Sequence, residues 1–414
     1  MMDRIMKFMN ESFTPKVNKI TKNVWVSSIQ DAVMTILPLI LVGSLVTIIS
    51  LLNEMFTWMP DFSLINTFTF GLLGLFVAFL VPYFIMEKKK FDNKKLIAGA
   101  TGISLYLFLL SPVMIEGGKV QFILERFGAT GMFLSLIVGL FVGFVLVLFS
   151  RFSFFSEDST MPDFIITWFD TLIPITLIML VGWLIGVQGN IDFFDVILAI
   201  FKPLSNIVQS YPGFVLSVFI PAFLYTFGIS GWVMMPVIYP VYLSGLAENA
   251  SVAAAGGTPS NIAVMETLYA FTSMGGMGTT LPLVIMMVLF AKSMRLKAIG
   301  RATIVPSIFN INEPLIFGAP VVFNPFLMIP LWLCAIIIPS ITYWTLHLGL
   351  VSIPTKTFML WYIPFPISSY LATQDWRAII LAAVLFVVAF AIFFPFFKAY
   401  DMQEKKNELN AADE

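Results

Sequence analysis

The sequence predicts an all-α, polytopic membrane protein, and three observations lead to this fold class. Only 11% of the 414 residues are charged, whereas a typical soluble domain carries about 25%. Hydrophobic residues make up 59% of the chain, and many lie in runs close to the length of about 20 residues that a helix needs to cross the hydrocarbon core. Basic residues gather in short clusters between these runs. Because backbone groups in hydrocarbon must pair with one another, we expect the spans to be helices.

The apolar runs are the candidate transmembrane helices. They lie at 33–52, 67–86, 96–115, 130–150, 165–187, 213–247, 280–294, 325–345 and 378–397. The start of the chain is polar and basic, and no short apolar stretch with a small-residue cleavage site follows it, so we expect no cleaved signal peptide. The basic clusters alternate with the runs in a way that predicts a cytoplasmic N-terminus and a loose, cytoplasmic C-terminal tail.

The two halves of the chain differ in how often polar or helix-breaking residues interrupt the apolar runs, and this difference predicts the domain organisation. Residues 1–188 hold uninterrupted runs with short loops and are expected to form a transmembrane scaffold. Residues 189–212 carry charges beside an apolar stripe, which is typical of an amphipathic connector at the membrane interface. Gly, Pro, Ser, Thr and Asn interrupt residues 213–398, and such interruptions indicate a transporter's binding site. Residues 399–414 form the tail.

The segment "NINEPLIFGAP" (310–320) combines breaks in the helix with a carboxylate. Pro314 disfavours helical geometry at Glu313 and removes a backbone donor. A glycine and a second proline break the chain again a few residues later. Since the apolar flanks are short, we predict a re-entrant hairpin, in which two half-helices enter from one side and expose a polar tip.

Glu313 is expected at or near this tip, together with Asn310 and Asn312. An ionisable residue inside a membrane indicates a functional site by default. A carboxylate accepts hydrogen bonds from sugar hydroxyl groups or acts on one as a general base. The alternative is a solvated structural loop, since Arg301 lies only twelve residues upstream.

Three stretches of the chain carry a family resemblance: "NINEPLIFGAPVVFNP" (310–325), "DWRAIILAAVLFVVAFAIFFPFFKAYD" (375–401) and the "GGMGTTLPL" turn (275–283). They resemble the membrane IIC subunit of the bacterial phosphotransferase system, in its lactose/cellobiose/diacetylchitobiose branch. The resemblance runs the length of the chain, including the basic N-terminus.

This resemblance implies ten transmembrane helices plus two re-entrant hairpins, a homodimer formed through the N-terminal half, and a sugar site in the C-terminal half. It also implies a cytoplasmic IIB protein, supplied in turn by IIA, that phosphorylates the sugar from a cysteine. Glu313 then matches the glutamate that holds the sugar hydroxyl to be phosphorylated. The implied activity is that of a sugar permease that takes up a disaccharide, β-linked as in cellobiose or diacetylchitobiose.

One position departs from the family pattern. The family carries a histidine in a "Gly-Ile-His-Gly" turn, where this chain has "FGISG" (227–231), so Ser230 stands in its place. The family histidine contacts the sugar. Serine donates and accepts a hydrogen bond but takes no proton near neutral pH. The departure predicts that sugar binding persists while phosphoryl transfer weakens.

Three aromatic residues are further candidates for the sugar site. Tyr225 and Trp361 lie beside turn sequences, and Trp232 follows the Ser230 turn directly. Aromatic faces stack on the apolar faces of sugar rings. An interfacial aromatic belt is the alternative for each of them.

Three other side chains have a functional and a structural interpretation. His347, the only histidine, is expected to be a helix residue satisfied by a neighbouring carbonyl, with replacement of the missing family histidine as the alternative. Glu266 fits a first hairpin or a surface loop equally well. Cys334 is expected to be a small buried apolar residue. Because it is a poor phosphocysteine candidate, the phosphoryl-carrying domains must be separate chains.

The sequence also excludes several function classes. One cysteine and one histidine leave almost nothing for a zinc or haem site, and we expect no metal and no cofactor. No glycine-rich turn ends in Lys-Ser or Lys-Thr, which excludes ATP-driven transport by this chain alone. No basic tract indicates nucleic acid, and membrane lipid is the expected environment.

Two other functions stay open besides the phosphotransferase permease. A facilitator or proton-coupled sugar transporter without efficient phosphorylation is favoured by Ser230, with Glu313 as the coupling group. A membrane sensor that binds sugar without moving it ranks last, because the short tail offers no signalling domain.

Overall fold

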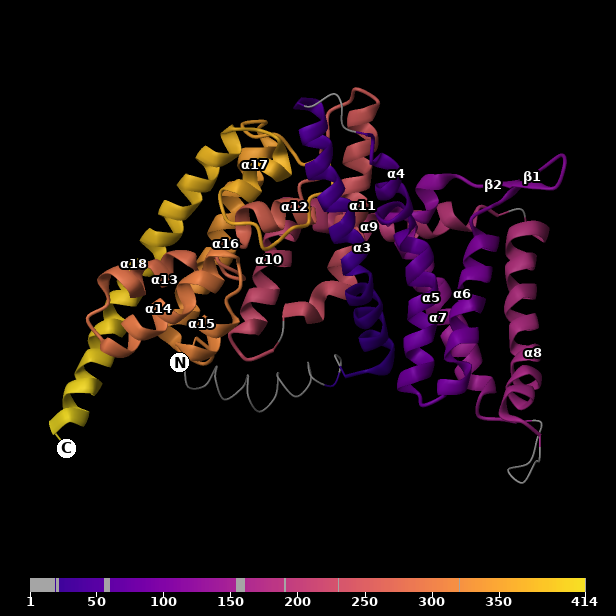
Figure 1. The fold of residues 1–414 in the computed structure, drawn as a ribbon, viewed down its shortest axis with the longest axis horizontal. Helices are drawn as coiled ribbons and strands as arrows, with labels where there is room; N and C mark the ends of the chain where they lie inside the picture. The colour runs from indigo at the N-terminus through magenta and orange to yellow at the C-terminus, as the bar shows by residue number, and fades with distance from the viewer. Residues whose placement is uncertain are drawn as a thin grey trace. The chain divides into compact units, whose positions relative to one another are not determined.

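The protein is described by a computed structural model that covers residues 19, 22–55, 60–153, 161–189, 191–229, 231–319 and 321–413. It is almost entirely helical (Figure 1). The described residues contain one pair of strands, β1 (Val113–Ile115) and β2 (Lys119–Gln121), which form an antiparallel hairpin with Met114 opposite Val120. This short hairpin was not anticipated.

The chain divides into two compact units, which we call the N-terminal unit (Lys19–Ser205 with Met235–Ser244) and the C-terminal unit (Asn206–Met234 with Gly245–Glu414). Helix α11 (Met235–Ala254) contributes one part to each unit. The boundary after Ser205 falls inside the segment 189–212, and each unit is described separately below.

The N-terminal unit is built from α-helices joined by short turns. Its α-helices are α3 (Val24–Met55), α4 (Ser63–Phe68), α5 (Leu73–Lys88), α6 (Lys95–Leu109), α7 (Met132–Phe149), α8 (Asp163–Trp183) and most of α9 (Phe193–Gln209). The turns between them include η2 (Phe70–Leu72), η3 (Asp92–Lys94), η4 (Leu124–Phe127), η5 (Ala129–Gly131) and η6 (Leu184–Gln188).

Helix α5 packs against both α6 and α7 in the core of this unit. Glycines allow the close approach. A Cβ atom on Gly139 of α7 would lie 2.7 Å from Cβ of Val81 on α5, and one on Gly102 of α6 would collide with the Ala78 carbonyl. Small residues at such crossings are the usual way for membrane helices to gain packing contact.

Buried and half-buried charges in this unit pair with one another. Lys94 Nζ lies 3.3 Å from Asp170 Oδ2, with both side chains under one-tenth exposed. Arg126 donates to both carboxylate oxygens of Asp192, at 2.9 Å and 2.7 Å. Burial raises the pKa of the Asp192 carboxyl, but the Arg126 guanidinium outweighs it, so the pKa lies below its ordinary value.

The C-terminal unit mixes long helices with short ones. Its helices are α10 (Tyr211–Tyr225), η7 (Gly231–Met234), α12 (Met265–Thr267), η8 (Leu268–Thr272), α13 (Leu281–Phe290), α14 (Met294–Ile308), α15 (Glu313–Gly318), α16 (Pro325–His347), α17 (Ile367–Thr373) and α18 (Arg377–Asp413). Helices α10 and α18 both pack against α16, and α13 packs against α14 (Figure 1).

Six of the described helices are long and apolar enough to cross a membrane. The spans are Val24–Gly43, Ser63–Lys88, Ala129–Phe149, Phe164–Gln188, Pro325–His347 and Arg377–Asn410. Helices α9 and α10 together give a seventh, but the chain bends by 80° between them. The protein is therefore a multi-pass, all-helical membrane protein.

The C-terminal tail differs from the prediction of a loose segment, which is wrong. Helix α18 continues to Asp413 and docks on the start of α14. Asp401 accepts hydrogen bonds from the backbone N–H groups of Lys292 and Ser293, both at 2.9 Å. Glu408 accepts from Arg295 N–H at 2.8 Å. These carboxylates satisfy the free donors at a helix N-terminus, which no apolar pattern in the sequence reveals.

Candidate functional site

The predicted break around Glu313 is confirmed. Helix α14 ends at Ile308 and α15 begins at Glu313. Asn310 in the turn between them adopts φ +61°, a left-handed conformation that asparagine tolerates better than most residues. With 15 and 6 residues, the two helices rise only about 22 Å and 9 Å, short of the about 30 Å hydrocarbon core.

Asn310 joins this turn to two other segments. Its Oδ1 accepts from Gly275 N–H at 2.9 Å, and its Nδ2 donates to the carbonyls of Trp361 (2.7 Å) and Ile363 (3.0 Å). The side chain is 8% exposed. Both amide hydrogens are thus engaged by backbone carbonyls.

Asn312 makes similar contacts on the other side of the turn. It is buried, and its Nδ2 donates to the Met277 carbonyl at 2.8 Å and to Thr280 Oγ1 at 3.1 Å. The two asparagines therefore fix the turn, and their amide N–H groups donate to other residues of the protein.

The glycine-rich turn that receives these asparagines needs its glycines. Gly275, Gly276 and Gly278 have φ of +76°, +100° and +83°, where other residues are strained. A Cβ on Gly276 would lie 2.6 Å from Asn312 Oδ1. The "GGMGTT" stretch is thus the structural partner of "NIN", a pairing that the sequence does not show.

A third segment, the loop 348–366 between α16 and α17, is held by side chains from four places. Its carbonyls accept from Asn310, as above, and Pro354 O accepts from Asn249 Nδ2 at 3.0 Å. Phe358 N–H donates to Glu266 Oε1 at 2.9 Å. Such side-chain bonds are what a buried loop without helix or strand requires, because its backbone groups have no regular partners.

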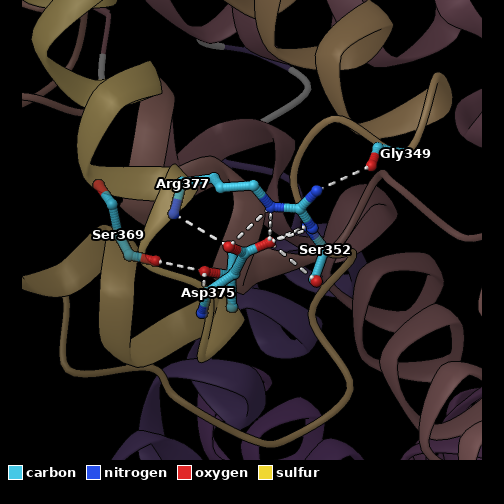
Figure 2. A network of polar contacts seen from close by, with 6 residues as sticks. Gly349, Ser352, Ser369, Asp375 and Arg377 are labelled. Atoms are coloured by element: carbon cyan, nitrogen blue, oxygen red, sulfur yellow. Dashed lines mark hydrogen bonds and ion pairs between the residues drawn. The ribbon is translucent and has the colours of Figure 1, made fainter.

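The fourth attachment of the loop is the network in Figure 2. Asp375 accepts from Ser352 N–H at 2.9 Å and Ser352 Oγ at 3.0 Å, and from Arg377 Nη2 at 2.7 Å. Arg377 Nη1 also donates to the Gly349 carbonyl at 3.5 Å. The hydrogen bonds from Arg377, joined by those from Ser352, hold the pKa of the Asp375 carboxyl well below its ordinary range. The start of the loop is thereby tied to the start of α18.

The end of α10 supplies the aromatic candidate Tyr225. Its hydroxyl oxygen is buried with no hydrogen-bond partner among the described residues, and it lies within electrostatic reach of Glu313. The turn that follows is anchored by Thr226, which accepts from Trp332 Nε1 at 3.1 Å and from Phe323 N–H through its carbonyl, also at 3.1 Å.

The remaining candidates stand as follows. Ser230 lies outside the described residues, and only the backbone of Trp232, in η7, is described. Trp361 is half-buried and packs edge-on against Tyr362, with ring centroids 5.7 Å apart. Its backbone meets Asn310, and its ring remains a candidate for stacking on a sugar.

His347 and Cys334 are not part of this site. His347 is exposed at the end of α16 and stacks on Tyr343 with 5.7 Å between ring centroids, so its described contacts are with rings instead of a carbonyl. Cys334 is fully buried, as expected of a small apolar residue.

Glu313 is the one acid of the site that faces outward. Its side chain is exposed, and the structure assigns its carboxylate no hydrogen bond or ion pair within the described residues. A carboxylate offers about four acceptor positions. With the amide nitrogens of both neighbouring asparagines engaged elsewhere, the Glu313 carboxylate is available to bind a ligand hydroxyl.

Sequence reasoning missed the residues that hold the loop. The sequence does not indicate Asn249 or Asp375 as site residues, and it fits Glu266 equally well to a hairpin or to a surface loop. All three are polar residues close to glycine, proline or other polar residues in an apolar context, which is the available signal. Their partners lie 105, 23 and 92 residues away along the chain.

Comparison with known proteins now decides the family. A family model described as "Phosphotransferase system, EIIC" matches residues 30–335. The chain belongs to the phosphotransferase system EIIC family. It falls in the lactose/cellobiose/diacetylchitobiose branch, as the resemblance implied, and it is a sugar permease component of the bacterial membrane.

Relatives and a solved structure cover nearly the whole EIIC chain. The cellobiose-specific EIIC component of Geobacillus stearothermophilus is 31% identical over 443 residues, 98% of this chain and 96% of that protein. The oligo-beta-mannoside-specific EIIC component of Bacillus subtilis (strain 168) is 28% identical over 97% of this chain and 94% of that protein. The crystal structure of ChbC, the IIC component of the N,N'-diacetylchitobiose-specific system, matches with a TM-score of 0.86 at 27% identity, over 97% of this chain and 99% of that one.

Proposed function

We propose that this EIIC protein takes up a β-linked disaccharide and presents it to a cytoplasmic IIB protein for phosphorylation. Relatives named for cellobiose, lactose and oligo-beta-mannoside, and a structural match named for N,N'-diacetylchitobiose, support this substrate class. Relatives named EIICB, such as the lactose-specific protein of Staphylococcus haemolyticus, of which this chain covers 71%, support a partner that carries the B function.

The topology that we propose has ten transmembrane helices, two re-entrant hairpins, cytoplasmic termini and a homodimer formed through the N-terminal half. The short pairs α12–α13 and α14–α15 are the proposed hairpins. Lipid surrounds the apolar spans. The transport half moves relative to the dimer scaffold, so that the sugar site opens to each side in turn.

The single observation that carries the proposal is the free carboxylate of Glu313 at the turn between α14 and α15. In the proposed mechanism it accepts a hydrogen bond from the sugar hydroxyl that attacks the phosphoryl group, and it holds that hydroxyl in line. It also takes up the proton as a general base. The phosphoryl chemistry itself resides on IIB.

The other site residues have supporting roles in this mechanism. Asn310 and Asn312 donate to backbone carbonyls of other segments. They thereby fix the turn that carries Glu313. Tyr225 offers a buried hydroxyl that has no hydrogen-bond partner among the described residues and lies within electrostatic reach of Glu313. Trp361, and in the same way Trp232, supplies an aromatic face for the sugar ring.

Ser230 favours a second candidate function, transport without efficient phosphorylation. Serine at the place of the family histidine takes no proton near neutral pH, so Glu313 is the remaining base. In this case Ser230→His would raise IIB-dependent phosphorylation. Uptake that ignores IIB but follows a proton gradient would favour the facilitator or symporter.

The test is uptake of labelled cellobiose and diacetylchitobiose into vesicles with and without IIB, with analysis of the product. For the wild type we expect sugar phosphate that depends on IIB. Glu313→Gln should lower its formation about 100-fold or more, the usual contribution of a general base. Glu116→Gln, at an exposed acid in the β1–β2 turn, is the control and should match the wild type. A fully active Glu313→Gln protein would refute the mechanism.

A further inference from the structure

Glu266, at the start of the proposed first hairpin, is a buried acid that the mechanism above does not use. It lies in α12 and is 1% exposed. Its Oε1 accepts from Phe358 N–H at 2.9 Å, whereas Oε2 is buried with no partner among the described residues. None of the ion pairs found among the described residues includes it.

A short stretch, residues 358–363, is held at both ends. Phe358 lies at its first end, and Asn310 binds its last residues. Glu266 binds Phe358, and Asn310 binds the carbonyls of Trp361 and Ile363. The stretch 358–363 is folded tightly between these points, since Trp361 N–H donates to the Met359 carbonyl at 2.9 Å. An acid and an amide, from segments more than forty residues apart in the sequence, therefore clamp one piece of loop.

We propose that Glu266 is a positioning residue of the sugar site, which acts as an uncharged carboxylic acid and holds the stretch 358–363 in place through Phe358. This inference rests on the proposed function, because the stretch carries Trp361 and touches Asn310 behind Glu313. Glu266 cannot itself bind the sugar in this arrangement, since it is almost completely covered.

The uncharged state follows from the surroundings of the two oxygens. A buried carboxylate needs several donors or a cation to offset its lost hydration. Oε2 has none among the described residues, and Tyr269, a phenol without positive charge, lies within electrostatic reach of Glu266. A neutral acid needs fewer partners, and its Oε1 still accepts from Phe358.

According to the proposal, Glu266 needs an acceptor oxygen but no negative charge, and two substitutions test this. Glu266→Gln keeps an acceptor oxygen and stays uncharged. Glu266→Leu fills a similar volume but has no acceptor, and it leaves Phe358 N–H unsatisfied. Thr267→Val is the matched control, because Thr267 is equally buried in the same helix and its Oγ1 has no partner among the described residues.

The experiment measures two quantities on the full-length protein in nanodiscs. Affinity for labelled cellobiose and diacetylchitobiose should be close to wild type in Glu266→Gln and Thr267→Val, and about tenfold weaker in Glu266→Leu, the loss of one well-made hydrogen bond. Hydrogen exchange of peptides covering 358–363 should rise in Glu266→Leu alone. In combination with Asn310→Ala, the loss from Glu266→Leu should be less than additive, because both side chains hold the same stretch.

Each outcome decides something. Equal loss in Glu266→Gln and Glu266→Leu would overturn the uncharged role. Unchanged affinity and exchange in a folded Glu266→Leu protein would overturn the positioning role altogether. If the wild type binds neither sugar, the proposed substrate class fails, while the exchange of 358–363 still decides whether Glu266 holds the loop.

Discussion

The two units of this protein satisfy their buried polar groups in different ways. In the N-terminal unit, charged side chains pair with one another, as Lys94 does with Asp170 and Arg126 with Asp192. The C-terminal unit also has ion pairs, such as Arg377 with Asp375, but many of its polar side chains bind backbone groups of other segments, as Asn310 does with the loop 348–366. The difference follows from the helices, which satisfy their own backbone in the first unit but are broken in the second.

The pairing of side chains with backbone recurs in the segment just before α12. Gln209 donates to the Ala263 carbonyl at 2.9 Å and accepts from Ala263 N–H at 2.8 Å. Asn249 makes the same two bonds with Asn261, at 2.7 Å and 3.0 Å. Each side-chain amide thus pairs with a backbone N–H and a backbone carbonyl, as a neighbouring β-strand would do. These polar residues of the C-terminal unit therefore fix the backbone of segments that are neither helix nor strand.

The largest effect on stability is expected at Lys94. Lys94→Met removes the cation that faces the buried Asp170 carboxylate, and breaking a buried ion pair typically costs about 3–5 kcal/mol of folding free energy. Because the pair lies among the scaffold helices, the affinity of the folded protein for sugar should not change. Thermal unfolding and sugar binding of the purified protein measure the two quantities.

A second variant makes the Lys94 experiment decisive. Lys94→Met combined with Asp170→Leu replaces the whole pair by apolar side chains and should recover most of the lost stability. A drop in sugar affinity without a drop in stability would break the proposed division between the units.

The second-largest effect is expected at Asn310, where substitution should lower the affinity for the sugar. Asn310→Ala removes three hydrogen bonds to two segments, each worth about 1 kcal/mol. We expect affinity for the sugar to fall about 100-fold, with the fold retained. Asn324→Ala, which removes a helix-capping amide at the start of α16, is the control and should lower stability without a comparable loss of affinity.

A smaller loss of binding is expected at Gly276. Its φ of +100° costs any other residue about 1–2 kcal/mol, and a Cβ there would press on Asn312. Gly276→Ala should therefore weaken sugar binding about tenfold. Gly256→Ala is a matched control, because φ there is +75° and a Cβ would meet nothing within 4 Å. Equal losses in the two variants would show that backbone strain alone matters.

Composition and apolar runs were enough to predict the helical membrane fold. The break at 310–314 was also predictable, because proline and asparagine act on the residues next to them. Such effects are local, so a single sequence displays them. The same local pattern places Glu313 at this break, where its side chain is exposed, and its role in binding the sugar stays a prediction.

The partners of that turn were not predictable. The sequence places Asn310 and Asn312 at the sugar site, but it does not show that their amides also bind the glycine turn and the loop 348–366. The docked tail and the buried Glu266 were missed for the same reason. A hydrogen bond between segments 35 to 109 residues apart leaves no periodic mark in the sequence.

The smallest effect is expected at Asp375, which ties the loop 348–366 at the end farthest from Asn310. Asp375→Asn keeps an acceptor oxygen but loses the charge that faces Arg377, so exchange of residues 349–353 should rise severalfold. Sugar affinity should fall by about threefold or less, since the other attachments remain and a single hydrogen bond contributes about 1 kcal/mol.

The pH dependence of this attachment has a defined sign. Arg377 lowers the folded-state pKa of the Asp375 carboxyl, so its stabilisation is fully present above the ordinary value of about 3.9 and is lost as the pH falls through the lower, folded-state value. Between pH 8 and pH 5, protection of 349–353, corrected for intrinsic exchange, should therefore stay constant in the wild type. A loss of protection within this range would show that Asp375 does not hold the loop as a carboxylate. An affinity loss in Asp375→Asn as large as that of Asn310→Ala would show that the whole loop, rather than its 358–363 stretch, sets the sugar site.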